Sequence, residues 1–501
     1  MANAGYRHGD DLRALAYSGQ ERMIVAIEMT VDHTTDVARW TVGSAASAAP
    51  LPRPSPRYRW RMAGPPDDIL EVLAGLDYET ALTPDDPRYV DTAEARGSTQ
   101  TPNRLAMKFG LLLRDGRFLP PTKKHVLFFG HIGSGKTTEL RRYCRQLEGA
   151  DRYLVIEVSV HDVLDRNNFE YTDLLMALAL ALCERLHERD VSVPKSAVAG
   201  LERWFVENVK TEESLDEFSA TVQAGIEGKA GIPLLTSLFV KFTAAFKTNV
   251  TYKDTLRRVV RNTCSQFAAA FNAFIREAEQ CSSKAGVAQR FLFVVDGTDK
   301  LSGGDRRRFF TEDHEQLLGI EAHVVYTAPL ALKYEGNLVS GIDADLFLPL
   351  IKIGERDGSP VDAGRRVMRD MLLRRAAEAL FDGDEPIDAL VSSCGGHPRE
   401  LLRLLKLCCE FSDGTQITAP VVDRAIDALA AEYRRFLEPE DYAHLANIDL
   451  NPVHTGNDER TRKLLYNLAL LEYNDGSWRH SHPVVDRLEG YRDARRQYEA
   501  E

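Results

Sequence analysis

Short apolar runs alternate with longer amphipathic segments through the middle of the chain. The runs at 125–130, 153–160, 290–297 and 322–329 are rich in β-branched and aromatic residues. The segments at 136–147 and 171–188 have the composition and length of helices. A strand that is apolar on both sides must be covered on both faces, so this alternation predicts a parallel sheet flanked by helices, which is an α/β fold.

A long helical insertion, at about 191–288, separates the second of these strands from the third. Within it, residues 230–248 read AGIPLLTSLFVKFTAAFKT, which is apolar apart from a few polar positions and two lysines. Such a helix either packs inside the protein or contacts a partner or a membrane surface, and the pattern leaves both open. We predict a contact surface around Leu234 to Phe246, and replacing Phe239 and Phe246 with Ser would test it.

The remaining segments differ in character from the predicted sheet. After Asp362 the pattern is all-helical, and after Asp441 a helix leads into an apolar strand, the tight-turn sequence Asn474-Asp475-Gly476 and a short strand, which suggests a winged helix. Residues 44–66 are rich in Ala, Pro, Ser and Arg, which predicts a disordered linker, and 22–31 read as a strand. Helical periodicity begins just after Met62, which suggests the hypothesis that the biological start lies at that methionine.

These patterns divide the chain into four parts. The predicted parts are a poorly ordered N-terminal segment and linker (1–66), an α/β core with its helical insertion (67–360), a helical lid (361–437) and a C-terminal winged-helix domain (438–501).

Composition and charge narrow the classes of protein. The 501 residues are 44% hydrophobic and 28% charged, as in ordinary globular proteins, and no run approaches the ~18 apolar residues of a membrane span. The N-terminus lacks the pattern of a signal peptide, and the seven cysteines are scattered, so we expect free thiols and a cytoplasmic protein. The net charge of −12 disfavours sequence-independent nucleic-acid binding as the main activity.

The sequence GHIGSGKT, which follows the strand at 125–130, matches the phosphate-binding loop G-x-x-x-x-G-K-[ST] in full. Its glycines let backbone N–H groups surround the phosphates, Lys136 reaches the β- and γ-phosphates, and the Thr137 hydroxyl ligates Mg²⁺. The predicted nucleotide-binding residues are Gly130, His131, Ile132, Gly133, Ser134, Gly135, Lys136, Thr137 and Thr138. A triphosphate with Mg²⁺ is therefore the expected ligand.

Polar residues end two further strands of the predicted sheet. Asp296 ends the strand at 290–297 and is expected to hold Mg²⁺ through water, and Asp299 lies three residues on, placed to orient or activate the attacking water. Thr327, at the end of the next strand, could contact the γ-phosphate or this water. The alternatives are a turn cap for either aspartate and a plain strand end for Thr327.

Together these residues resemble the STAND and Orc/Cdc6-like branch of AAA+ ATPases, which implies ATP as the nucleotide. The run VVDGTDKL is similar to the STAND Walker B, with Lys300 where an acid is common, which implies slow hydrolysis. In GGHPRELLRLL, the resemblance places Pro398 near the adenine and makes Arg399 a phosphate-contacting sensor arginine. Arg96 stands where the family has an adenine-side element, although Gly97 replaces its glutamate.

The run WRHSHPVVDRL resembles the Met-His-Asp element of immune STAND proteins. This resemblance aligns His482 with the histidine that contacts the β-phosphate of ADP, and Pro483 replaces the aspartate. A histidine in solvent is the simpler alternative, and a metal site built from His480 and His482 is a third.

The resemblance implies a slow ATPase that acts as a nucleotide-controlled switch on a partner or a separately encoded effector, with antiviral defence or signalling in bacteria as context by analogy. The alternative is an Orc/Cdc6-like DNA-binding protein, such as an initiator or transposition regulator. Residues 451–501 hold 8 Lys and Arg against 9 Asp and Glu, which favours the switch. A homo-oligomer stays open, and a small-molecule kinase would not need a winged helix.

Overall fold

The computed structural model describes residues 64–164, 168–209, 232–248, 250–301, 307–335, 341–452 and 456–500, with the backbone of three strands nearer the N-terminus. The chain forms two compact units, Met1–Ala63 and Gly64–Glu501. In the first unit, β1 (Leu12–Ala16), β2 (Val25–Asp32) and β3 (Val37–Val42) form an antiparallel sheet in the order β1-β2-β3. The sequence predicted one strand here, at 22–31, which β2 overlaps. It did not predict β1, β3 or their pairing into a sheet. Most of the predicted linker at 44–66 lies outside the described residues.

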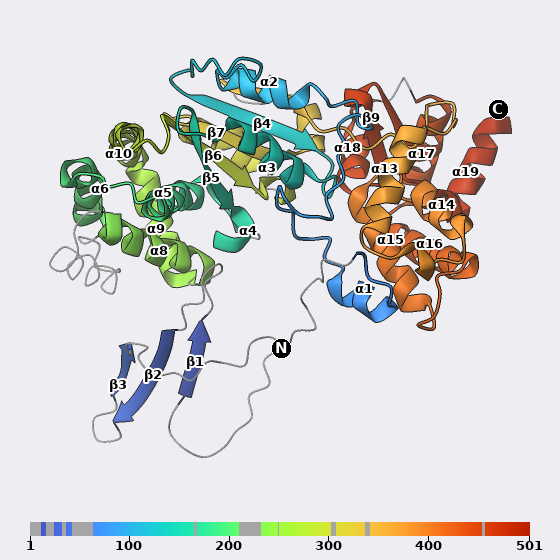
Figure 1. Ribbon diagram of the computed structural model, residues 1–501, viewed down its shortest axis with the longest axis horizontal. Coiled ribbons are helices and arrows are strands. Elements are labelled where there is room, and N and C mark those ends of the chain that lie inside the picture. The colour runs from blue at the N-terminus through green and yellow to red at the C-terminus, as the bar shows by residue number, and fades with distance from the viewer. Residues whose placement is uncertain are drawn as a thin grey trace. The chain divides into compact units, whose positions relative to one another are not determined.

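The core of the second unit is a five-stranded parallel sheet (Figure 1). Its strands are β4 (Lys124–Gly130), β5 (Tyr153–Ser159), β6 (Arg290–Asp296), β7 (His323–Pro329) and β8 (Ile342–Phe347). They lie in the order β5-β6-β7-β4-β8. The predicted α/β fold with a parallel sheet is confirmed, and the arrangement is consistent with a P-loop NTPase fold.

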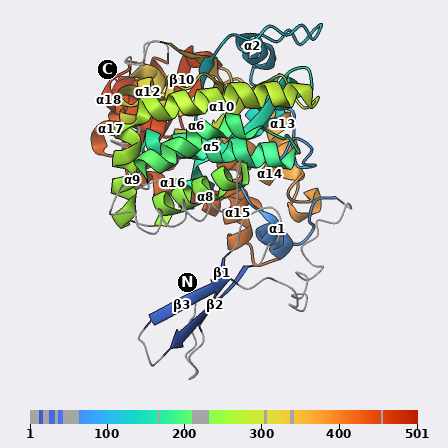
Figure 2. The same ribbon diagram turned by 90° about the vertical axis from the view of Figure 1, so that its left-hand side faces the viewer.

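Helices cover the sheet, and those of the insertion lie side by side in Figure 2. The helices of this part are α1 (Ile69–Gly75), α2 (Thr101–Lys108), α3 (Lys136–Leu147), α4 (Val160–Val163), α5 (Tyr171–Glu188), α6 (Lys195–Asn208), α8 (Ile232–Thr248), α9 (Val250–Asn262), α10 (Cys264–Lys284) and α12 (His314–Leu317). α8 packs on α5, and α6 packs on α10. Across the described ranges, no helix has both the length and the apolarity to cross a membrane.

The apolar helix of the insertion belongs to the core. Phe239 of α8 is fully buried, and its ring lies 5.2 Å from that of Phe205 and 6.5 Å from that of Phe267. The predicted contact surface is therefore wrong at Phe239, because this side chain packs against α6 and α10. The Phe246 side chain lies outside the described residues.

Helices dominate the C-terminal part, which Figure 1 colours orange and red. They are α13 (Asp362–Leu373), α14 (Asp384–Ser393), α15 (Pro398–Phe411), α16 (Ala419–Arg434), α17 (Pro439–Leu450), α18 (Glu459–Tyr466) and α19 (Glu489–Ala500). Between α18 and α19, β9 (Leu470–Tyr473) and β10 (Trp478–Ser481) form an antiparallel hairpin. The predicted order of helix, strand, turn and strand is present, and its assignment to the winged-helix class stays a prediction.

Candidate nucleotide-binding site

The loop between β4 and α3 has the conformation that its glycines permit. Gly133 and Gly135 have φ angles of 83° and 94°, in the left-handed region that favours glycine. A Cβ atom on Gly133 would lie 2.9 Å from both His397 Cε1 and Arg399 Nε. Glycine at this position therefore allows the N-terminus of α15 to pack directly on the loop.

The Lys136 side chain points back into the loop. Its Nζ donates hydrogen bonds to the carbonyl oxygens of Gly130 at 3.0 Å and His131 at 2.8 Å, and lies 2.6 Å from Asp299 Oδ2. Burial lowers the pKa of Lys136, while the negative charge of Asp299 opposes this shift. The ammonium group is thus held by acceptors that phosphate oxygens could replace.

Thr137 and Asp296 meet at the same end of the sheet. The Thr137 hydroxyl donates a hydrogen bond of 2.7 Å to Asp296 Oδ1. Burial raises the pKa of Asp296, and the charge of Asp299 adds to this shift. A hydroxyl and a carboxylate are oxygen ligands of the kind that Mg²⁺ prefers, so the two residues fit the predicted metal role.

Thr327 lies behind Asp299 rather than at the surface of the site. Its side chain is fully buried, and its hydroxyl accepts a hydrogen bond from the Gly297 N–H at 3.0 Å. The same hydroxyl donates to Asp299 Oδ1 at 3.4 Å. Thr327 is therefore placed to position Asp299 and the turn after β6, and not to touch a ligand.

Residues 361–437, which the sequence predicts to form a lid, contact the loop through the start of α15. His397 is fully buried, its Nε2 lies 2.9 Å from the carbonyl oxygen of Ile132, and its Nδ1 accepts a hydrogen bond from the Glu400 N–H at 3.3 Å. Burial holds the pKa of His397 well below its usual range, so the ring is neutral and its proton lies on Nε2. Arg399 pairs with Glu79, with Nη2 at 3.1 Å from Oε2.

Residues 88–96, which we call the strap, run along α3 from its first turn. Arg96 Nη2 donates to the Ser134 carbonyl oxygen at 2.7 Å, and its Nε donates to the Thr92 hydroxyl at 2.8 Å. The Thr92 hydroxyl in turn donates to Glu139 Oε1 at 2.9 Å, and the Tyr89 hydroxyl lies 3.2 Å from the same oxygen. The strap is thereby fixed to both the loop and α3.

The hairpin also reaches the loop. The Glu472 N–H donates a hydrogen bond of 3.0 Å to His131 Nε2, and burial lowers the pKa of His131 to about 3, so this ring is neutral. The fully buried Glu472 carboxylate accepts from Arg479 Nε at 2.9 Å and from the Tyr334 hydroxyl at 2.6 Å. His131, predicted among the phosphate-binding residues, thus uses its side chain to hold the hairpin.

His482 lies apart from these residues. Its side chain is fully buried, its Nδ1 accepts a hydrogen bond from the Val484 N–H at 3.3 Å, and its Nε2 lies 4.0 Å from Glu400 Oε2. The ring centroid is 5.0 Å from that of Tyr433. In this structure, His482 joins the segment after the hairpin to α15 and α16 and is not part of the candidate nucleotide-binding site.

A cavity of about 670 Å³ opens between the loop, the strap and the lid, within the usual size range of ligand pockets. The predicted site residues that line it are Gly133, Gly135, Lys136, Thr137, Thr138, Asp296, Asp299, Pro398 and Arg399. The lining does not include the predicted residues Gly130, His131, Ile132, Ser134, Thr327 and His482. Sequence reasoning missed Glu139 and Arg375, which also line the cavity and belong to no short motif.

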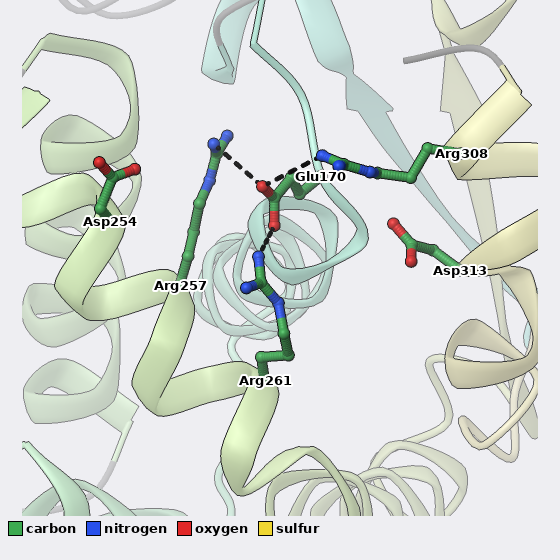
Figure 3. Close-up of a pocket in the computed structure, with 6 residues that line it drawn as sticks. All are labelled: Glu170, Asp254, Arg257, Arg261, Arg308 and Asp313. Carbon is green, nitrogen blue, oxygen red and sulfur yellow. Dashed lines mark hydrogen bonds and ion pairs between the residues drawn. The ribbon is translucent and has the colours of Figure 1, made fainter. Parts of the chain in front are cut away.

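A second cavity, of about 490 Å³, is lined by six charged residues (Figure 3). At its centre, the Glu170 carboxylate lies 3.5 Å from Arg257, 2.5 Å from Arg261 and 3.6 Å from Arg308. The lining holds three acidic and three basic residues, so it offers no excess of charge to attract an ion. Burial, together with the charge of Glu170, raises the pKa of Asp313 to about 6.

No family model matches the chain, and no curated protein matches it. Among solved structures, the Walker-type ATPase of Pyrococcus abyssi aligns with 83% of this chain and 100% of that chain, at 11% sequence identity and a TM-score of 0.37. A similarity this weak carries no argument about function, which therefore rests on the geometry of the site.

Proposed function

We propose that the protein binds ATP with Mg²⁺ in the cavity above the loop and hydrolyses it slowly. The observation that carries this proposal is the cavity itself, into which the loop, the strand end at Asp296 and the lid residue Arg399 all converge. Its cations include Lys136 and Arg399, and its oxygen ligands include Thr137 and Asp296. Thr137 and Asp296 would hold Mg²⁺, which would offset the negative charge of the phosphates.

The roles of the residues follow from their present partners. Lys136 would exchange the carbonyl oxygens of Gly130 and His131 for phosphate oxygens, which also separates it from Asp299. The Asp299 carboxylate, positioned by Thr327, would then be available to orient the attacking water and accept its proton. Lys300, which also lines the cavity, takes the place of a second acid, consistent with slow turnover.

The first test is nucleotide affinity, measured by calorimetry with ATP and with ADP. Lys136→Ala should lose most of the binding because it removes the buried phosphate-binding charge. The matched control is Lys123→Ala, since Lys123 is exposed, donates to the Leu318 carbonyl oxygen at 2.7 Å and does not line the cavity. Equal affinity of wild type and Lys136→Ala would reject the proposed site.

We further propose that the bound nucleotide sets a STAND-like switch read by a partner protein. Supporting this are the two contacts that join the loop to distant parts of the chain, His397 to Ile132 and Glu472 to His131. Any change of the loop between ATP and ADP would favour different positions of lid and hairpin. A role in bacterial defence or signalling rests on family analogy alone.

Hydrogen exchange in ATP-bound and ADP-bound protein tests the switch. Peptides that cover 396–402 and 470–481 should exchange at different rates in the two states, whereas peptides within α10 should not. Identical rates would reject the switch. No feature of the described residues specifically favours the DNA-binding alternative, and anisotropy with duplex DNA would reveal it.

A further inference from the structure

Arg375 is a buried cation that has no ion-pair partner among the residues that the structure describes. It lies just after α13, lines the cavity and is 6% exposed. Its Nη1 donates to the carbonyl oxygens of Met371 at 2.9 Å and Arg88 at 3.3 Å. No described carboxylate lies within ion-pair distance of it. The charge of Asp86 acts on it from farther away, and Asp86 itself is paired with Arg88 at 2.8 Å.

This arrangement points to a missing acceptor. A guanidinium has five N–H donors, and the two carbonyl bonds of Arg375 use only Nη1. Buried charges are normally paired, because an unpaired charge loses its hydration without compensation. Burial lowers the pKa of Arg375 to about 10, and the neighbouring charge of Arg88 adds to this shift, so the group is still charged at neutral pH. Among the described residues, no acceptor lies within hydrogen-bond distance of its remaining donors, Nε and Nη2, and the residue itself lines the cavity.

The strap shows at which end of the cavity Arg375 lies. From its C-terminal end, the strap first contacts the loop through Arg96 and then the first turn of α3 through Thr92. Farther toward its N-terminal end, the Tyr89 ring lies 3.9 Å from the guanidinium of Arg142 in the next turn of α3. The carbonyl oxygen of the preceding residue, Arg88, is the one that accepts from Arg375. Phosphates bind at the N-terminus of α3, so Arg375 lies toward the opposite, nucleoside end of the cavity.

The surroundings at this end suit a flat, largely apolar group. Val90 of the strap, Met371 of α13 and Leu402 of α15 all line the cavity and offer apolar surface to the faces of a ring. A purine carries acceptor nitrogens in the plane of its ring, where a guanidinium at the ring edge can donate to them.

We propose that Arg375 recognises the base of the bound nucleotide by donating hydrogen bonds to the ring nitrogens of a purine. This inference rests on the proposed function, since it concerns the same cavity. It assigns to one residue outside any sequence motif the choice of a purine over a pyrimidine.

The test compares ligands with and without a purine by calorimetry: ADP, UDP and inorganic tripolyphosphate. Arg375→Met should weaken ADP binding about tenfold or more, the usual effect of losing a charge-assisted hydrogen bond, and should reduce the preference for ADP over UDP. Tripolyphosphate binding should be unchanged. Arg375→Lys keeps the charge but not the planar fork, so we expect an intermediate loss. It also provides the measurement if Arg375→Met does not fold.

The matched control is Arg374→Met. Arg374 is the exposed neighbour that donates to the Pro87 carbonyl oxygen at 2.8 Å and to the carbonyl oxygen of Tyr89 in the strap, and it does not line the cavity. This control should keep the affinity for ADP, which separates base recognition from a general loosening of the strap. Unchanged ADP affinity in Arg375→Met and Arg375→Lys, or an equal loss for tripolyphosphate, would overturn the inference while leaving the proposed function intact. Failure of the wild type to bind either ADP or tripolyphosphate would instead reject the proposed function, and the inference with it.

Discussion

The junction between the hairpin and the core is the most informative place to perturb the protein. The Glu472 side chain is 0% exposed and that of Arg479 3%, and the two groups meet at 2.9 Å. Glu472→Ala would leave the Arg479 guanidinium buried with only neutral acceptors, the Gly456 carbonyl oxygen and Asn457 Oδ1. Removing one member of a buried ion pair costs about 3–5 kcal/mol, so we expect a large local destabilisation.

Two further variants separate the buried charge from the shape of the hairpin. Glu472→Gln keeps an acceptor for Arg479 and Tyr334, so it should cost less than Glu472→Ala. The double variant Glu472→Leu with Arg479→Met removes both charges and keeps similar side-chain volumes. It should be close to neutral, and so cost about 3–5 kcal/mol less than Glu472→Ala.

Because the chain is large, hydrogen exchange is a better assay than global unfolding. In Glu472→Ala, the peptide covering 470–481 should exchange faster. The loop should loosen with it, since the Glu472 N–H is bonded to His131, and ADP should dissociate faster. If Glu472→Ala exchanges as slowly as wild type, or if the double variant is as unstable as the single one, the buried ion pair does not hold the hairpin.

Three other changes test separate contacts. His397→Ala removes the hydrogen bond to the Ile132 carbonyl oxygen, worth about 1 kcal/mol, and should weaken ATP binding roughly fivefold in calorimetry, whereas an unchanged affinity would dissociate the lid from the loop. Gly133→Ala places a Cβ 2.9 Å from His397, so the exchange of peptides from α15 should increase; slow exchange there would show that the packing can relax. The pKa of Asp313 is raised from 3.8 to about 6, so protonation of this carboxyl stabilises the fold, and the stabilisation is lost as pH rises through about 6. The melting temperature of Asp313→Asn should therefore depend less on pH between 4 and 6 than that of wild type.

Local patterns predicted the core elements well. The helices at 136–147 and 171–188 have the predicted bounds, and four of the five parallel strands lie where apolar runs indicated. The fifth, β8, was missed because its sequence IDADLF alternates with acids. Asp343 pairs with Lys108 at 2.8 Å and Lys124 at 2.9 Å, so its polarity is explained only by partners that the fold brings together.

In the candidate site, too, residues in local motifs were predictable, whereas residues that depend on distant contacts were not. Lys136, Thr137 and Asp296 follow from motifs in which a few adjacent residues carry the chemistry. The role of His131 could not be predicted, because its partner Glu472 lies 341 positions away in the sequence. His482 was placed by resemblance to an element whose aspartate is here Pro483, and the structure has it between the hairpin segment and the lid.

Three parts of the chain contact the loop, and these contacts explain how a slow ATPase could still act as a switch. His397 of the lid binds the Ile132 carbonyl oxygen, Arg96 of the strap binds the Ser134 carbonyl oxygen, and Glu472 of the hairpin binds the His131 ring. If the proposed function is correct, phosphate binding draws Lys136 away from the carbonyl oxygens at the start of this loop. A resulting shift of the loop would alter all three hydrogen bonds. A nucleotide shifts the equilibrium between two arrangements of lid and hairpin by the difference in its affinity for them. The size of this shift does not depend on the rate of hydrolysis. Slow hydrolysis would then set how long the ATP-bound arrangement lasts, while the three contacts determine how different it is from the ADP-bound one.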